Sequence, residues 1–167
     1  MKIGILSDTH NNTENLKRAL TIFRREGVET LIHCGDMTTA KTAVHLAGFT
    51  LVYVHGNMDA NPIAIRRALF ELNPSSVAAN HFSGELIPGV RVAATHSHIP
   101  GKLDSLIRDG YNYVFHGHTH RRRDEIIGPT RVINPGALGG AQHEPRSICI
   151  LDLKTGQSRF INLADWV

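Results

Sequence analysis

The chain has 167 residues, with 18 lysine and arginine residues against 15 aspartate and glutamate residues and a formal net charge of +3. This weak positive charge suits a small anionic substrate. The sequence lacks the clustered basic stripe of a nucleic-acid-binding protein, so nucleic acid is not indicated as a partner and stays open only as a substrate. The hydrophobic fraction of 41% is that of a globular protein, and no apolar run approaches the ~20 residues that cross a bilayer, so we expect no membrane contact.

Three strand–loop–helix units are expected in the first half of the chain, because short apolar runs there end in polar residues and lead into helical patterns. The predicted strands cover residues 2–7, 30–33 and 50–54. The predicted helices cover the stretch from Asn11 or Asn12 to Gly27, then residues 38–47 and 62–70. This alternation is typical of a parallel sheet, in which ligands bind beyond the carboxyl ends of the strands.

The second half changes to short alternating runs interrupted by glycine and proline, which are typical of β-hairpins. The predicted elements are hairpins over 74–92, a strand over 91–95, a helix over 103–108, strands over 111–115, 124–127 and 130–133, a turn at 134–136, and a final hairpin of 147–153 with 157–163. No repeat or linker separates the two halves. We therefore expect one α/β domain over residues 1–167, with two facing mixed β-sheets (a β-sandwich) flanked by helices.

The two cysteines, Cys34 and Cys149, both lie in strand-like contexts. They predict buried, reduced thiols and not a disulfide framework. The N-terminal segment passes directly into a strand without the pattern of a signal peptide. Together these features predict a cytoplasmic protein.

The chain has 11 histidines, and several alternate directly after predicted strands. His118 and His120 follow the strand over 111–115, and alternation on extended backbone lets them point the same way. His96 and His98 follow the strand over 91–95. Neutral imidazole is the commonest metal-binding side chain, although this spacing alone fits a metal site and a surface loop equally well.

Polar residues follow the other strands as well, so side chains that are distant in sequence should meet in one crevice. The expected metal ligands are Asp8, His10, Asp36, Asn57, His96, His118 and His120. A single zinc ion needs three or four ligands, whereas seven mixed nitrogen and oxygen donors suit two divalent cations that share a bridging carboxylate. Asp36, at the end of the central strand, is the natural bridge.

Five short motifs in this order resemble those of the calcineurin-like metallophosphoesterases. The motifs are Asp8-x-His10, Gly35-Asp36, Gly56-Asn57-x-Asp59, Thr95-His96-x-His98 and Gly117-His118-x-His120. The chain looks most similar to the small single-domain bacterial and archaeal phosphodiesterases of that superfamily. The resemblance covers nearly the whole chain and implies a sandwich of two mixed sheets with helices outside.

The resemblance also implies which residues bind which metal. One ion would take Asp8, His10 and His120, with Asp36 shared, and the other would take Asp36, Asn57, His96 and His118. Manganese is the cation we expect first, with nickel, iron and zinc as alternatives. The implied reaction is hydrolysis of a small phosphate ester by a hydroxide that bridges the two ions, with activity that falls below about pH 6 and rises toward pH 8–9.

Catalytic roles beyond the metals are implied for Asn57, Asp59 and His98. Asp59 would orient a ligand or a neighbouring histidine, and His98 would contact the phosphoryl group or assist the leaving group, with a plain surface position as the alternative. Many larger relatives carry a histidine at the position of Met58. Unlike that histidine, the Met58 side chain cannot donate a proton. His55 stands where arginine is common, which leaves the local substrate contacts open.

Other interpretations stay open at this point. A non-catalytic scaffold of the same fold, or a phosphomonoesterase with the same metals, would share most of these motifs, and homo-oligomer formation is undecided. Any one of the strand-end acids or amides could be a helix cap. We expect structural or surface roles for His33, His45, His55, His81, His116 and His143. The run Arg121–Arg123 is either a solvated loop or a rim that attracts anionic substrate.

Overall fold

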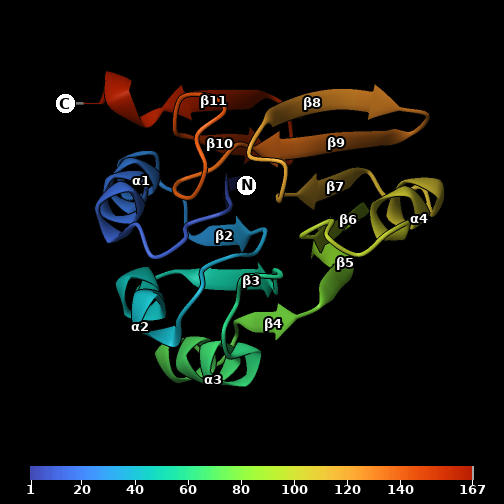
Figure 1. The fold of residues 1–167 in the computed structure, drawn as a ribbon. Coiled ribbons are helices and arrows are strands. Elements are labelled where there is room, and N and C mark those ends of the chain that lie inside the picture. The colour runs from blue at the N-terminus through green and yellow to red at the C-terminus, as the bar shows by residue number, and fades with distance from the viewer. Residues whose placement is uncertain (167) are drawn as a thin grey trace.

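The computed structural model describes residues 1–166, which form four layers (Figure 1). The first half contains β1 (Lys2–Leu6), α1 (Thr13–Arg25), β2 (Thr30–His33), α2 (Ala40–Ala43), the 3₁₀ helix η1 (Val44–Leu46), β3 (Thr50–Val54), α3 (Pro62–Leu72) and β4 (Val77–Ala79). The second half contains β5 (His81–Ile87), β6 (Val90–Thr95), α4 (Lys102–Arg108), β7 (Tyr113–His116), β8 (Arg122–Ile127), β9 (Thr130–Pro135), β10 (Ser147–Asp152), β11 (Ser158–Asn162) and the 3₁₀ helix η2 (Leu163–Asp165).

Two mixed sheets form the inner layers, as the sequence predicts. The six-stranded sheet has the order β11-β10-β1-β2-β3-β4, in which β1 to β4 are parallel and only β10 runs in the opposite direction, between β1 and β11. The five-stranded sheet has the order β5-β6-β7-β9-β8, in which β6, β7 and β9 are parallel and the two edge strands are antiparallel. The α/β sandwich is therefore confirmed.

The core lies on both sides of the six-stranded sheet, because successive side chains of a strand point to opposite faces. Ile3 and Ile5 of β1 pack between the sheets against Phe115 and Ile133 of the other sheet. Leu31 packs on the opposite face, under α1 to α3. In Figure 1 these three helices cover one outer face, and α4 covers the outer face of the five-stranded sheet.

Helix α1 forms where the sequence predicts it. The side chain of Asn12 accepts a hydrogen bond from the backbone N–H of Asn15 at 3.0 Å and caps the first turn. Leu16, Leu20 and Phe23, one helical face, are buried. The helix packs this face on the sheet and leaves the loop of residues 7–12 at the carboxyl end of β1.

The helix expected over residues 38–47 is shorter and changes type. Thr38 has φ +82°, a left-handed conformation that cannot begin a right-handed helix, and its N–H donates to Asp59 at 2.9 Å. The helical turns therefore start at Ala40 and tighten to a 3₁₀ helix from Val44. This correction places Thr38 in the loop that faces the end of β3.

Two boundaries in the second half also differ from the predictions. β7 begins at Tyr113 and not at 111, because Asn112 belongs to the preceding loop. The backbone N–H of Asn112 donates to the carbonyl of Arg91, and its side-chain oxygen accepts the N–H of Arg91. The predicted turn at 134–136 is instead the end of β9, where Asn134 and Pro135 pair with β8, and the chain turns only at Gly136.

Cys34 and Cys149 are free and buried, as expected. Within residues 1–166, no helix combines the length and the apolar character that crossing a bilayer requires. The single-domain organisation stays a prediction.

Candidate metal centre

The polar residues that follow β1, β2, β6 and β7 converge on one buried point. Oδ1 of Asp8 lies 3.2 Å from Nε2 of His120 and 3.9 Å from Nε2 of His10. The two histidine Nε2 atoms are 3.3 Å apart. These three donor atoms lie within 4.8 Å of one another, a spacing that suits a single cation.

A second group of donors adjoins the first. Nε2 of His96 lies 3.2 Å from Oδ2 of Asp36 and 3.9 Å from Oδ1 of Asp8. Asp8 is common to both groups, and Oδ2 of Asp36 also lies 3.7 Å from Nε2 of His10. Both carboxylates therefore lie between the two groups, which is the arrangement that two neighbouring cations need.

His118 and Asn57 lie at the edge of this cluster. The backbone N–H of His118 donates to Oδ2 of Asp8 at 3.1 Å, and its ring centroid is 5.0 Å from that of His96. The peptide after Asn57 packs on Asp36, since the N–H of Met58 donates to its Oδ1 at 2.8 Å. The Asn57 side chain is exposed and makes no hydrogen bond within residues 1–166. The cluster thus contains five of the seven predicted ligands, with two beside it.

Unpaired polar atoms in the cluster indicate what it binds. Oδ1 of Asp8 and Nε2 of His96 are buried and lack a hydrogen-bond partner among the described residues. Burying such groups without a partner costs about 1–3 kcal/mol each, and more when the group is charged. A cation between them would satisfy both, so the residues present fit divalent metal ions.

Hydrogen bonds to backbone carbonyls orient two of the imidazoles. Nδ1 of His96 donates to the carbonyl of Cys34 at 2.7 Å, and Nδ1 of His120 donates to the carbonyl of Ala141 at 2.7 Å. Each bond leaves Nε2 of the neutral ring with its lone pair toward the cluster. Sequence reasoning missed both contacts, because a backbone carbonyl leaves no signature in the residue type.

The backbone at the cluster is held in an uncommon conformation. Five predicted ligands have positive φ: Asp8 at +53°, His10 at +45°, Asp36 at +58°, His118 at +70° and His120 at +56°. This left-handed region costs an ordinary residue roughly 1–2 kcal/mol. Such strain persists only where the surrounding structure enforces it, and it is typical of functional sites.

Glycines let the backbone approach the donors closely. A Cβ at Gly140 would lie 2.6 Å from His10 Cδ2 and 2.7 Å from His120 Cε1. One at Gly35 would lie 2.6 Å from His96 Nδ1, and one at Gly117 would overlap Ser7 Oγ. Only glycine fits at these positions, so they belong to the site although they offer no ligand atom.

The carboxylates and imidazoles shift one another's pKa values. Burial lowers the pKa of His96, but Asp36 and Asp8 outweigh it and raise that pKa above its ordinary value. The carboxylate of Asp8, with Oδ1 3.2 Å from Nε2 of His120, raises the pKa of His120 in the same way. For His10, burial outweighs the carboxylates and lowers the pKa. The centre is thus a negative environment that favours added positive charge.

Asp59 points away from the cluster. Its carboxylate accepts the Tyr53 hydroxyl at 2.6 Å, the Gly56 N–H at 2.8 Å and the Thr38 N–H at 2.9 Å. Burial alone would raise its pKa, but these donors and His55 lower it to about 2. Asp59 therefore holds the loop of residues 55–59 in place.

His98 lies beside the cluster, with its ring centroid 5.4 Å from that of His96 and 6.5 Å from that of His118. Its Nδ1 is buried without a hydrogen-bond partner in the described chain. Burial, followed by these two neighbouring rings, lowers the pKa of His98. The half-buried ring of His98 thus lies at the edge of the centre.

Two of the histidines predicted as structural are buried supports. Nε2 of His33 lies 2.8 Å from the Thr9 hydroxyl, and its Nδ1 accepts the Gly35 N–H at 3.2 Å. His116 is 3% exposed and lies under the loop that carries His118. In the arginine run, Arg122 bonds the hydroxyl of Ser147 at 2.9 Å and supports the fold.

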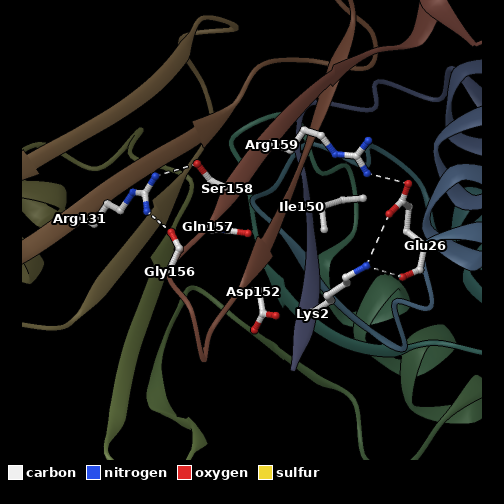
Figure 2. A pocket seen from close by; sticks show the side chains of 9 residues that line it. All are labelled: Lys2, Glu26, Arg131, Ile150, Asp152, Gly156, Gln157, Ser158 and Arg159. Carbon is white, nitrogen blue, oxygen red and sulfur yellow. Dashed lines mark hydrogen bonds and ion pairs between the residues drawn. The ribbon is translucent and has the colours of Figure 1, made fainter.

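A separate cavity of about 530 Å³ lies at the opposite end of the strands, where β1 and β11 begin. Figure 2 shows Lys2 and Arg159 directed at the carboxylate of Glu26, with ion pairs of 3.6 and 2.6 Å. Arg131 pairs with Asp124 at 2.7 Å. Because these charges satisfy one another, this cavity is not the candidate site.

Comparisons with known proteins agree with this geometry. Residues 1–156 match the model of the calcineurin-like phosphoesterase superfamily domain. The chain is 34% identical over 166 residues to Phosphodiesterase MJ0936 of Methanocaldococcus jannaschii, covering 98% of this chain and 99% of that protein. The solved structure of a novel archaeal phosphodiesterase is also 34% identical and covers 97% of this chain and 99% of that one, with a TM-score of 0.91.

The solved structure of Yfce, a phosphoesterase from E. coli, shares the fold at 22% identity and a TM-score of 0.71, covering 98% of this chain and all of that one (100%). The chain belongs to the calcineurin-like phosphoesterase superfamily and is a phosphoesterase. The family implies divalent metal ions, and the donor cluster around Asp8 is the candidate site for them.

Proposed function

We propose that this member of the calcineurin-like phosphoesterase superfamily is a phosphodiesterase that uses two divalent cations. The observation that carries the proposal is the position of Asp8, whose free Oδ1 lies between a group with His10 and His120 and a group with Asp36 and His96. The similarity to a named phosphodiesterase over nearly the whole chain supports the reaction class.

In this proposal each ion has its own ligands. Asp8, His10 and His120 would hold one ion, and Asn57, His96 and His118 would hold the other. Asp36 would be shared, since its Oδ2 lies 3.7 Å from Nε2 of His10 and 3.2 Å from Nε2 of His96. Manganese is the first candidate, and nickel, iron and zinc remain candidates because the nitrogen and oxygen donors suit all of them. When bound, the cations lower the pKa of water toward ~7 and neutralise charge on the phosphoryl oxygens.

The remaining residues bind and orient the ester. His98, whose ring lies beside those of His96 and His118, contacts a phosphoryl oxygen at the edge of the centre. Asp59 holds the loop that presents Asn57, through its bonds to Tyr53 and Gly56. Met58, exposed at 52%, offers no proton. The leaving group therefore takes its proton from water or His98, or leaves as a stable anion.

The substrate we propose is a small phosphodiester. A non-catalytic scaffold would have no reason to keep a complete donor set in a strained backbone, and this argues for the enzyme. A cytoplasmic location belongs to the same proposal, since both cysteines are free and buried.

The test is hydrolysis of bis-p-nitrophenyl phosphate by the purified protein with Mn²⁺, Ni²⁺, Fe²⁺ or Zn²⁺. We expect turnover that EDTA abolishes, a rate that rises from about pH 6 to pH 8–9, and a loss of several orders of magnitude in Asp36→Ala and His118→Ala. A parallel assay with p-nitrophenyl phosphate separates a diesterase from a monoesterase. No turnover with any of these four metals contradicts the proposal.

A further inference from the structure

A second cavity adjoins the metal centre at the carboxyl end of β3. It has a volume of about 310 Å³ and lies between the start of α3 and the end of β4. His55 lines it, and the next residue, Gly56, packs so closely on Asp36 that a Cβ there would overlap Oδ1 of the carboxylate. The cavity and the centre are therefore separated by one peptide.

His55 offers this cavity a free polar atom. The residue is 8% exposed, and its Nδ1 faces Oδ2 of Asp59 at 3.8 Å. The other ring nitrogen, Nε2, makes no hydrogen bond within residues 1–166. Asp59 itself is held by Tyr53 and Gly56, whereas Nδ1 of His55 is buried without a hydrogen-bond partner in the described chain.

Arg66 brings a positive charge to the same cavity. Its guanidinium has neither an ion-pair partner nor a hydrogen-bond partner in the part of the chain that the structure describes. The next residue on α3, Arg67, differs, since its Nε pairs with Glu71 at 2.8 Å and it does not line the cavity. Arg66 is thus free to bind an anionic group.

Apolar side chains form most of the remaining wall, together with the polar Asn80. Pro62, Ile63, Ala78 and Ala79 line the cavity, and Ile63 is 81% exposed although it is a large aliphatic residue. Exposing such a residue beside a polar centre leaves apolar surface that a ligand can cover. Apolar walls with a few placed polar groups are typical of sites for organic ligands.

We propose that this cavity binds one organic substituent of the phosphodiester, an apolar ring that carries a second anionic group. The ring lies against Ile63 and Ala79, the second anion pairs with Arg66, and Nε2 of His55 bonds a polar atom between them. The inference rests on the proposed function and names the substrate class for it.

The test compares two esters that release the same p-nitrophenolate. Thymidine 5′-(p-nitrophenyl phosphate) supplies the ring alone, and its 3′-phosphorylated derivative adds the second anion. For the wild-type protein we expect the 3′-phosphate to lower KM by about tenfold with little change in kcat, as a charge-assisted contact in a partly exposed site does. Equal KM values for the two esters overturn the proposal.

Matched variants assign the effect to the cavity. Arg66→Gln should remove the preference for the 3′-phosphate, whereas Arg67→Gln should keep it. Ile63→Ser should raise KM for both thymidine esters several-fold, whereas Ile126→Ser, at the distant and 75% exposed position on β8, should not. A preference that survives Arg66→Gln overturns the role of Arg66.

A binding measurement separates this inference from the proposed function. Thymidine 3′,5′-bisphosphate is added to the Zn²⁺-loaded protein, and the amide shifts of Ala78 and Ala79 are followed by NMR. Saturable shifts that are lost in Arg66→Gln support the cavity even if no ester is hydrolysed. Shifts that are absent, or unchanged in Arg66→Gln, overturn it even if the enzyme is active.

Discussion

The two oxygens of Asp8 have different partners: Oδ2 accepts the hydroxyl of Ser7 at 2.6 Å, whereas Oδ1 lies 3.2 Å from Nε2 of His120 without a hydrogen bond. The N–H of His118 adds a second bond to Oδ2 at 3.1 Å. The carboxylate is therefore held by one oxygen so that the other faces the two donor groups. This arrangement fixes a metal ligand before any metal arrives.

Removing the hydroxyl of Ser7 should loosen this ligand. We expect Ser7→Ala to weaken metal binding by 10–100-fold, the range usual for groups that orient a ligand, because Oδ2 of Asp8 loses its shorter bond. Competition with a chelating dye measures the affinity. Ser83→Ala, on β5, serves as the control and should bind metal like the wild type. Equal affinities for Ser7→Ala and wild type would show that Ser7 does not position Asp8.

Gly140 tests the close approach of the backbone to the histidines. Gly140→Ala should lower activity at least tenfold, because the new Cβ would lie 2.6 Å from the His10 ring and push it from the centre. Gly89→Ala is the matched control, since Gly89 also has positive φ (+78°) but has nothing within 4 Å of a new Cβ. Both should lose about 1 kcal/mol of stability, and only Gly140→Ala should lose activity. Equal activities would contradict this account.

Burial of His33 should make the fold sensitive to acid. Burial, which the nearby Asp59 and Asp8 oppose only in part, lowers the pKa of His33 from 6.5 to about 4. As the pH falls, the His33 ring of the unfolded chain binds a proton before the buried ring of the folded chain does. The folded state is therefore fully stabilised above about pH 6.5, and it loses about 3 kcal/mol of its free energy of unfolding as the pH falls toward 4. Urea unfolding in EDTA measures it. His33→Gln should be less stable than the wild type at pH 8, and its free energy of unfolding should fall less steeply between pH 6.5 and 4. An equally steep fall in the two proteins would contradict this role of His33.

Asp59 should act through the loop of residues 55–59. We expect Asp59→Asn to cost about 2–4 kcal/mol in the free energy of unfolding, because the NH2 group of the new amide would face at least one of the three donors and could not accept its hydrogen bond. Tyr53→Phe, which removes one donor, should cost about 1 kcal/mol. Thermal unfolding of the metal-free proteins gives both values, and an Asp59→Asn variant as stable as wild type would refute the positioning role.

The sequence predicts the site better than it predicts the support around it. Asp8 and Asp36 each follow a buried strand of the six-stranded sheet, and His96 follows a buried strand of the facing sheet. The carboxyl ends of these strands bring them together, and this convergence could be foreseen from residue order alone. The carbonyls of Cys34 and Ala141 could not, because any residue offers a carbonyl and only the folded chain places it.

Element boundaries fail for a similar reason. Thr38 has an ordinary side chain for a helix start, but its N–H bonds Asp59, which is distant in sequence, and the left-handed backbone delays the helix to Ala40. Asn134 and Pro135 have the composition of a turn, yet the ladder to β8 continues through them. In both cases a tertiary contact overrides the local preference.

Anomalous scattering from a crystal soaked in Mn²⁺, recorded at the manganese edge, tests the central claim most directly. We expect two peaks about 3.5–4 Å apart, one against Asp8, His10 and His120 and the other against Asp36 and His96. A single peak, or no peak at these side chains with saturating metal, would contradict a two-metal centre.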